Sequence, residues 1–261
     1  AQQVVEIGIN QIAFFISYND VILKRNICML LGNIVKHSIE LADYVMEKLN
    51  PTKLLSCLNE QDPMIAKNAA FCLCEIARKS FENSRKLVDH GGAAIIVEFI
   101  TNVKGDVRLY GIMTLGYIAS YKANLASELI KARAIVQLKD ALQNETQQYI
   151  KAAACYALGQ IGMHSSSHAK EVSDAYVLYL MLLYYRAHDS SDELKEQSKT
   201  ALINIINKCS NLAALEPLIT KASDDVLSCI LDQYLIHLKS STSEKKQFIQ
   251  NEGLKKLQDL Y

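Results

Sequence analysis

The hydrophobic and polar positions of this chain repeat with a long period. A fifteen-residue segment occurs five times, and its start recurs at intervals of 42, 42, 43 and 44 residues. Position nine is leucine and position twelve is isoleucine in every copy. Positions one, five, eight, nine and twelve share one face of a helix, which we expect to form the core. The pattern predicts five long helices, at residues 23–37, 65–79, 107–121, 150–164 and 194–208.

The stretches between the copies predict two shorter helices each. They break at Asn50 and Pro51 in one stretch and at Gly91 and Gly92 in another. Proline suits the first turn of a helix and glycine suits the turn before it, so both pairs mark the same corner. Each unit therefore holds three helices, and the repeated segment is the third. Glycine at position ten of three copies is expected to let the neighbouring helix approach closely; these residues are Gly32, Gly116 and Gly159.

A repeat of this period is the signature of a helical solenoid, in which each unit buries its apolar face against its neighbours. Only three residues are proline, ten are glycine, and no alternating β-branched runs occur, so we expect an all-α protein. We expect one domain over residues 1–261. The register weakens after Lys208, so residues 209–261 are expected to be a degenerate end, with a helix near 226–238 and a loop at 240–246.

Charge and cysteine content narrow the functional classes. Lys plus Arg and Asp plus Glu are equal at 28 each, so the net charge favours neither nucleic acid nor an anionic membrane. Seven cysteines without framework spacing fit a reducing compartment, and we expect a cytoplasmic protein. The longest apolar run, residues 176–185, is about half of what a helix needs to cross a bilayer, so no transmembrane segment is expected. Membrane attachment is expected only through an acylated leader preceding Ala1.

The repeat resembles the armadillo repeat. The residues that carry this resemblance are Lys67 to Ala70 leading into Leu73 and Ile76, and the Gly91 pair that opens the next short helix. It extends over essentially the whole chain and implies a right-handed solenoid of about five three-helix repeats with a degenerate C-terminal cap. A closer resemblance, to the later repeats of the sperm-associated antigen six family, rests on residues 104–109, 111–113, 115–119, 150–153, 157–162, 214–217 and 253–256.

Two cellular roles follow from these resemblances. The sperm-associated antigen six family supplies structural scaffolds of the axonemal central pair, and its members carry more repeats. We favour the role that follows from a second resemblance, to the shorter apicomplexan family built from armadillo repeats alone. That resemblance implies an adaptor on the cytosolic face of a secretory organelle, the rhoptry, held by an acylated N-terminus and recruiting adaptor and motor proteins that position the organelle.

In armadillo arrays the third helices line the concave groove, which points to positions three, seven, eleven and fourteen, spaced as one stripe along a helix. In the first two copies the stripe is basic with an apolar centre: Arg25, Met29, Asn33, Lys36, Lys67, Phe71, Glu75 and Arg78. In the next two it is aromatic and nearly uncharged, and its candidate binding residues, with two flanking tyrosines, are Leu109, Tyr110, Met113, Tyr117, Tyr121, Tyr156 and Gln160.

Such a groove suits another protein, as an extended segment or helix with acidic groups at one end and apolar anchors at the other. The alternative for each single lysine or arginine is an ordinary solvated side chain. The importin-α family, which carries basic peptides, needs tryptophan at position seven and asparagine at position eleven. This chain has no tryptophan, and only Asn33 and Asn204 match position eleven, so a nuclear import receptor is not favoured.

Candidates for chemistry are few. His164 and His168 have the spacing of a metal pair but no third ligand at a familiar spacing, so capping or surface roles are favoured. Cys72 and Cys74 point in different directions on one helix, and we assign them to packing. No phosphate-binding loop, nucleophile elbow or paired carboxylate occurs. We therefore expect no enzyme, no cofactor and no metal; an enzyme, the third class considered, would need a bound group.

Overall fold

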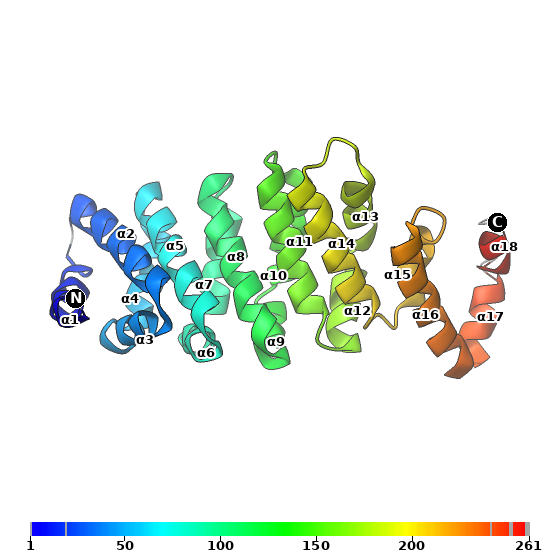
Figure 1. The fold of residues 1–261 in the computed structure, drawn as a ribbon, viewed down its shortest axis with the longest axis horizontal. Coiled ribbons are helices and arrows are strands. Elements are labelled where there is room, and N and C mark those ends of the chain that lie inside the picture. Colours follow the sequence, from blue (N-terminus) through cyan, green and yellow to red (C-terminus); the bar gives the residue numbers. More distant parts are fainter. Residues whose placement is uncertain (1, 19, 241, 251–252, 259–261) are drawn as a thin grey trace.

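The computed structural model describes residues 2–18, 20–240, 242–250 and 253–258, and within these ranges the regular elements are all helical. The chain forms an elongated stack with its termini at opposite ends (Figure 1). A row of third helices runs side by side along the stack. They are α2 (Val21–His37), α5 (Pro63–Lys79), α8 (Asp106–Tyr121), α11 (Gln148–Gly162), α14 (Asp192–Ile206) and α16 (Asp224–Ser240).

Two shorter helices precede most of the third helices, as the sequence predicted. The first helices of the units are α1 (Gln2–Phe15), α3 (Ile39–Lys48), α6 (Phe81–Asp89), α9 (Ala123–Lys131) and α12 (Ser166–Asp174). The second helices are α4 (Pro51–Ser56), followed by the short η1 (Cys57–Asn59), α7 (Gly92–Asn102), α10 (Ala134–Asn144) and α13 (Leu178–Arg186). The C-terminal end holds α15 (Leu212–Leu215), η2 (Glu216–Leu218), α17 (Thr242–Gln250) and α18 (Gly253–Gln258).

Helix ends depart from the predicted bounds by one or two residues. Side chains cap α2, α5 and α14, so these helices begin earlier than the apolar pattern does: Asp62 Oδ1, for example, accepts from the amides of Met64 and Ile65, both at 3.0 Å. The helices α8 and α11 also begin earlier, without a side-chain cap. Conversely, α11 ends at Gly162 and α14 at Ile206, each two residues before the predicted end. The predicted loop at 240–246 is wrong, because α17 already begins at Thr242.

The predicted corners between first and second helices are confirmed. Asn50 caps α4 by accepting from the amide of Thr52 at 2.9 Å, and Pro51 takes the first position of the helix. Gly91 takes the same corner before α7 with a φ of 80°. Arg133 and Tyr176 occupy equivalent corners with φ of 64° and 59°, so these turns use a left-handed residue even where the sequence supplies no glycine, whereas Asn50 has a φ of −56°.

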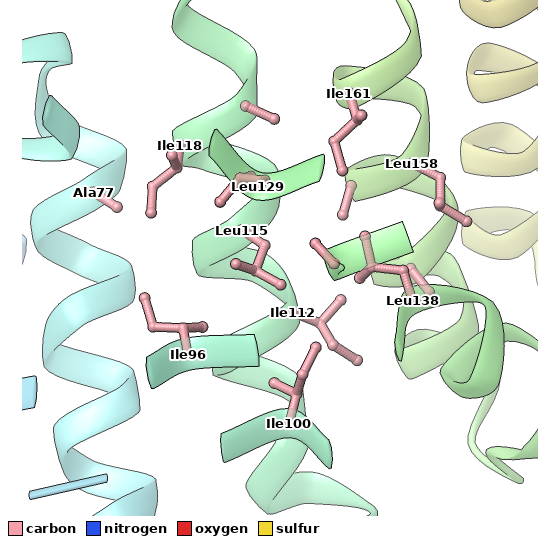
Figure 2. Close-up of a cluster of buried hydrophobic side chains, with 14 of the residues drawn as sticks. Ala77, Ile96, Ile100, Ile112, Leu115, Ile118, Leu129, Leu138, Leu158 and Ile161 are labelled. Carbon is pink, nitrogen blue, oxygen red and sulfur yellow. The ribbon is translucent and has the colours of Figure 1, made fainter. Parts of the chain in front are cut away.

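The core lies between the third helices and the two shorter helices behind them. Figure 2 shows Ile112, Leu115 and Ile118 of α8 packed among side chains of α5, α7, α9, α10 and α11. Positions five and nine are buried in all five copies, as predicted. Position eight is buried in copies two to five but not in the first, where Leu30 is 46% exposed. The third helix of a preceding repeat covers this position in the later copies, and α2 has no such neighbour among the described residues.

The glycines at position ten are spacers, as predicted. A Cβ at Gly32 would lie 2.5 Å from the ring of Phe71, and one at Gly116 would lie 2.7 Å from the ring of Tyr156. At Gly159 the neighbour is backbone, since a Cβ would lie 2.8 Å from Cα of Ala201. Glycine thus sets the distance between consecutive third helices.

A buried ion pair joins the third and fourth units. The Arg108 side chain is fully buried, and its Nη1 lies 2.8 Å from Oδ2 of Asp140 and 3.2 Å from Oε1 of Glu145. Arg108 also donates from Nη2 to the carbonyl of Gln137 at 3.1 Å. The Glu145 carboxylate accepts from the amide of Gly105, so it ties the turn before α8 to the turn before α11. Lys104 and Arg108 together hold the pKa of Asp140 at about 2.

We expect Gly159→Ala to lower the free energy of unfolding by about 1–3 kcal/mol, because the added methyl group pushes α11 away from α14. The matched control is Gly8→Ala in α1, where a Cβ meets nothing within 4 Å. That change should stabilise the helix by up to about 1 kcal/mol. Urea unfolding followed by circular dichroism measures both, and equal stabilisation by the two changes would contradict the spacer role.

We expect Arg108→Met to lower the free energy of unfolding by about 3–5 kcal/mol, because it leaves the Glu145 carboxylate buried without its cation. Arg85→Met is the control, since Arg85 pairs with Glu82 and Asp89 on an exposed helix face. Its effect should stay within about 1 kcal/mol. Comparable shifts of the two urea midpoints would show that the buried pair is not a structural link.

Candidate partner-binding groove

The predicted stripe residues lie on the row of third helices, and we call this surface the groove face. In the first copy Met29, Asn33 and Lys36 are exposed, whereas Arg25 is partly buried. In the later copies the stripe side chains are mostly half-buried, and in the second and fourth copies the ring at position seven packs over the glycine at position ten of the copy before it. The groove face is therefore built of side chains that also contribute to the stacking of repeats.

Part of the positive charge predicted for the first two copies is neutralised within the chain. The guanidinium of Arg25 forms an ion pair with Asp62, the residue that caps the next third helix. Arg78 Nη2 lies 2.5 Å from Oε2 of Glu75 on the same helix. The pairing with Asp62 raises the pKa of Arg25 and lowers that of the carboxyl, so both stay charged.

A surplus of positive charge remains at this end. Within the described part of the chain, Lys36 and Lys67 form no ion pair. Lys79 extends its Nζ to the carbonyl of Lys36 at 2.6 Å, which keeps its charge beside the C-terminal turn of α2. The basic character predicted for the first two copies thus rests on these lysines more than on the arginines.

Aromatic side chains continue the groove face from α5 onward. The rings of Phe71 and Tyr110 lie 5.2 Å apart in an edge arrangement, and Tyr121 donates its hydroxyl to the carbonyl of Arg78 at 2.9 Å. The rings of Tyr117 and Tyr156 lie 5.8 Å apart. Burial raises the pKa of Tyr156 to about 12, so the hydroxyl stays protonated and this stretch carries no charge of its own.

A hollow of about 310 Å³ lies on the groove face between α8, α11 and α14. It brings together five residues at stripe positions: Leu109, Met113, Tyr117, Ala152 and Tyr156. Tyr110, Tyr121 and Gln160 do not line it. The remaining lining residues are Tyr149, Ala153, Glu193 and Gln197.

Four of the lining residues were not predicted from the sequence, because they occupy positions of the repeat outside the stripe. Tyr149 precedes position one, Ala153 and Gln197 occupy position four, and Glu193 precedes the fifth copy. The sequence did contain a signal for the hollow. Positions three and four are both alanine in the fourth copy, whereas each of the first three copies has two larger side chains there.

The two histidines considered as a metal pair make contacts to the preceding unit. His164 Nε2 lies 2.6 Å from the carbonyl of Ala119 at the end of α8. His168 Nε2 lies 3.1 Å from the carbonyl of Ala123, and its Nδ1 lies 2.7 Å from Oγ of Ser165. These contacts fit the capping role. In the described ranges no group of three or more His, Cys, Asp or Glu side chains is placed to hold a metal ion.

Cys72 and Cys74 are both buried, which confirms their assignment to packing. Burial raises the pKa of Cys74 to about 12, so it is held as a thiol. Among the described helices, none is long and apolar enough to span a membrane.

Comparison with known sequences gives relatives over part of the chain. Human sperm-associated antigen 6 is 38% identical over 124 residues, which cover 48% of this chain and 24% of that protein. The mouse protein of the same name matches to the same extent. The chain spans about a quarter of the length of these curated relatives. No protein-family model matches the chain.

Solved structures match over most of the chain. A designed armadillo repeat protein is 18% identical, with a TM-score of 0.75 over 88% of this chain and 99% of the designed one. Another, solved in complex with the peptide (KR)4, is 19% identical, with a TM-score of 0.74 over 88% and 99%. At this identity the match establishes the fold. The chain is thus an armadillo-repeat solenoid, and about half of it is homologous to sperm-associated antigen 6.

Proposed function

We propose that this chain is a non-catalytic scaffold that recruits partner proteins through its groove face. The observation that carries the proposal is the hollow between α8, α11 and α14, where five residues at stripe positions of the repeat converge. Cavities with apolar and aromatic walls and a few polar groups are typical binding sites. The armadillo fold, which is typical of protein-binding scaffolds, supports the same role.

The charges and side chains of the groove face indicate which chemical groups the partner carries. Lys36, Lys67 and Lys79 favour acidic groups over the first two copies. Met113, Tyr117 and Tyr156 favour apolar anchors over the next two. The proposed partner is an extended segment or helix that spans several repeats. We further infer that residues 1–261 act as one binding domain, since the third helices from α2 to α16 contact one another in succession.

Two cellular roles are proposed from the sequence resemblances. The first is an adaptor that positions the rhoptry, a secretory organelle, in an apicomplexan parasite by recruiting adaptor and motor proteins on the cytosolic face of its membrane, with an acylated N-terminus as anchor. The second is a structural scaffold of the axonemal central apparatus, which the homology to sperm-associated antigen 6 favours. Imaging of the endogenous tagged protein distinguishes them, because the first role requires organelle staining and the second axonemal staining.

We expect the double change Lys67→Glu and Arg78→Glu to weaken partner binding at least about tenfold, since it places two negative charges where acidic groups should dock. Helicity should be unchanged, because a like-charge pair on a helix surface costs only about 0.2–0.5 kcal/mol. Affinity capture from the source cells, followed by calorimetric titration with the captured partner, measures the effect.

The matched control reverses Lys53 and Lys139 to glutamate. These residues lie on the second helices α4 and α10, away from the groove face. Capture that is unchanged in the groove variant, or lost equally in both, would place the partner site elsewhere.

A further inference from the structure

The hollow between α8, α11 and α14 exists because the fourth copy has small side chains at two adjacent positions. Positions three and four are Ala152 and Ala153 there, and Leu109 and Tyr110 in the copy before. The short side chains of both alanines line the hollow, whose volume of about 310 Å³ is room for a long side chain of a partner. The site is thus specific to one repeat and is not a feature of every unit.

Tyrosine rings form much of its wall. Tyr117 and Tyr156 pack edge to face at 5.8 Å. Tyr149 stands 39% exposed at the mouth, and its hydroxyl donates to the carboxylate of Asp106 in the preceding unit, which fixes the ring. An aromatic ring attracts a cation over its face by about 0.5–2 kcal/mol when the contact is partly desolvated.

The charged side chain in the wall of the hollow is acidic. Glu193 is the one charged residue among its lining side chains, it is exposed, and it has no ion pair within the described part of the chain. Asp106 adds a second carboxylate beside Tyr149. Lys151 and Lys195 lie on the same helices but do not line the hollow: their ammonium groups donate to the hydroxyl of Tyr184 at 2.9 Å and to the carbonyl of His188 at 3.5 Å.

We propose that this hollow binds a cationic side chain of the partner, with arginine preferred over lysine, placed against the tyrosine rings and paired with Glu193. A guanidinium suits the site because its plane stacks on aromatic rings while its edge pairs with a carboxylate. This inference rests on the proposed function and makes it more specific. The partner carries acidic groups over the first two copies and a basic residue over the fourth and fifth, which fixes the direction in which it lies.

The test is a titration of the isotope-labelled chain, followed by nuclear magnetic resonance, with the blocked tripeptides acetyl-Gly-Arg-Gly-amide and acetyl-Gly-citrulline-Gly-amide. Citrulline has nearly the same shape as arginine but no charge. We expect saturable shifts of the Tyr149, Ala153 and Glu193 amides with arginine, and binding at least about tenfold weaker with citrulline. Raising the salt concentration should weaken the arginine peptide more than the citrulline peptide.

Three variants complete the test. Glu193→Gln should bind the arginine peptide no better than the citrulline peptide, and Ala153→Tyr, which copies Tyr110 of the preceding unit, should abolish binding by filling the hollow. Glu196→Gln is the control, because Glu196 is exposed on the same helix but does not line the hollow, and it should bind as the unchanged chain does.

The proposal is overturned if arginine causes no saturable shift at these amides, if citrulline binds equally well, or if acetyl-Gly-Phe-Gly-amide binds the hollow more tightly than arginine does. The outcome is separable from that of the proposed function. If the double change Lys67→Glu and Arg78→Glu abolishes partner capture but the arginine peptide does not bind the hollow, only the cationic site is refuted. Arginine binding with capture unaffected by the groove variant supports the cationic site and refutes the groove as the partner surface.

Discussion

The close contact between consecutive third helices is the constraint on which this structure depends. The contact row is made of small side chains: glycine occupies position ten in three copies, and Cys72, Thr114, Ala157 and Ala201 occupy position eight. Consecutive helices can therefore approach until a position-seven ring covers the preceding glycine, as Phe71 covers Gly32 and Tyr156 covers Gly116, or until backbone meets glycine, as Ala201 meets Gly159. Dispersion contacts are gained along the whole row, and a single added methyl group forfeits part of them.

The same spacing produces the groove face. Because the repeats stack in register, residues about 43 positions apart lie side by side, and polar contacts cross from unit to unit. Tyr121 reaches the carbonyl of Arg78 and Tyr149 reaches Asp106, so the exposed ends of these rings are fixed by the neighbouring repeat. A surface held in this way can bind a long segment with little loss of side-chain entropy, which favours affinity. The stacking of the repeats and the shape of the groove face are consequences of one packing arrangement.

The periodicity of the chain predicted the helices, their corners and most of the core, because burial in a solenoid follows the helical repeat. Leu30 is exposed although position eight was predicted to be buried. Burial at this position depends on a third helix in the preceding repeat, which the pattern within one segment does not indicate. The caps at Asp20 and Asp62 were also missed, since they lie outside the apolar pattern.

For the groove, the pattern located the stripe. It did not reveal that Arg25 is paired with Asp62, because ion pairs between units depend on side-chain geometry. The pair of Arg78 with Glu75 lies within α5 and joins two residues of the stripe itself. Nor did the pattern reveal the hollow, which depends on two alanines in one copy.

The most direct test of the central claim, that partners bind along the row of third helices, is site-specific photo-crosslinking in the source cells. A photoreactive phenylalanine analogue replaces Met29 or Thr200 on the groove face, and Lys53 or Val136 on the second helices, all of which are exposed. The account predicts crosslinks to a common partner from both groove positions and none from the second-helix positions. Crosslinks to that partner from Lys53 and Val136, with none from Met29 and Thr200, would contradict it.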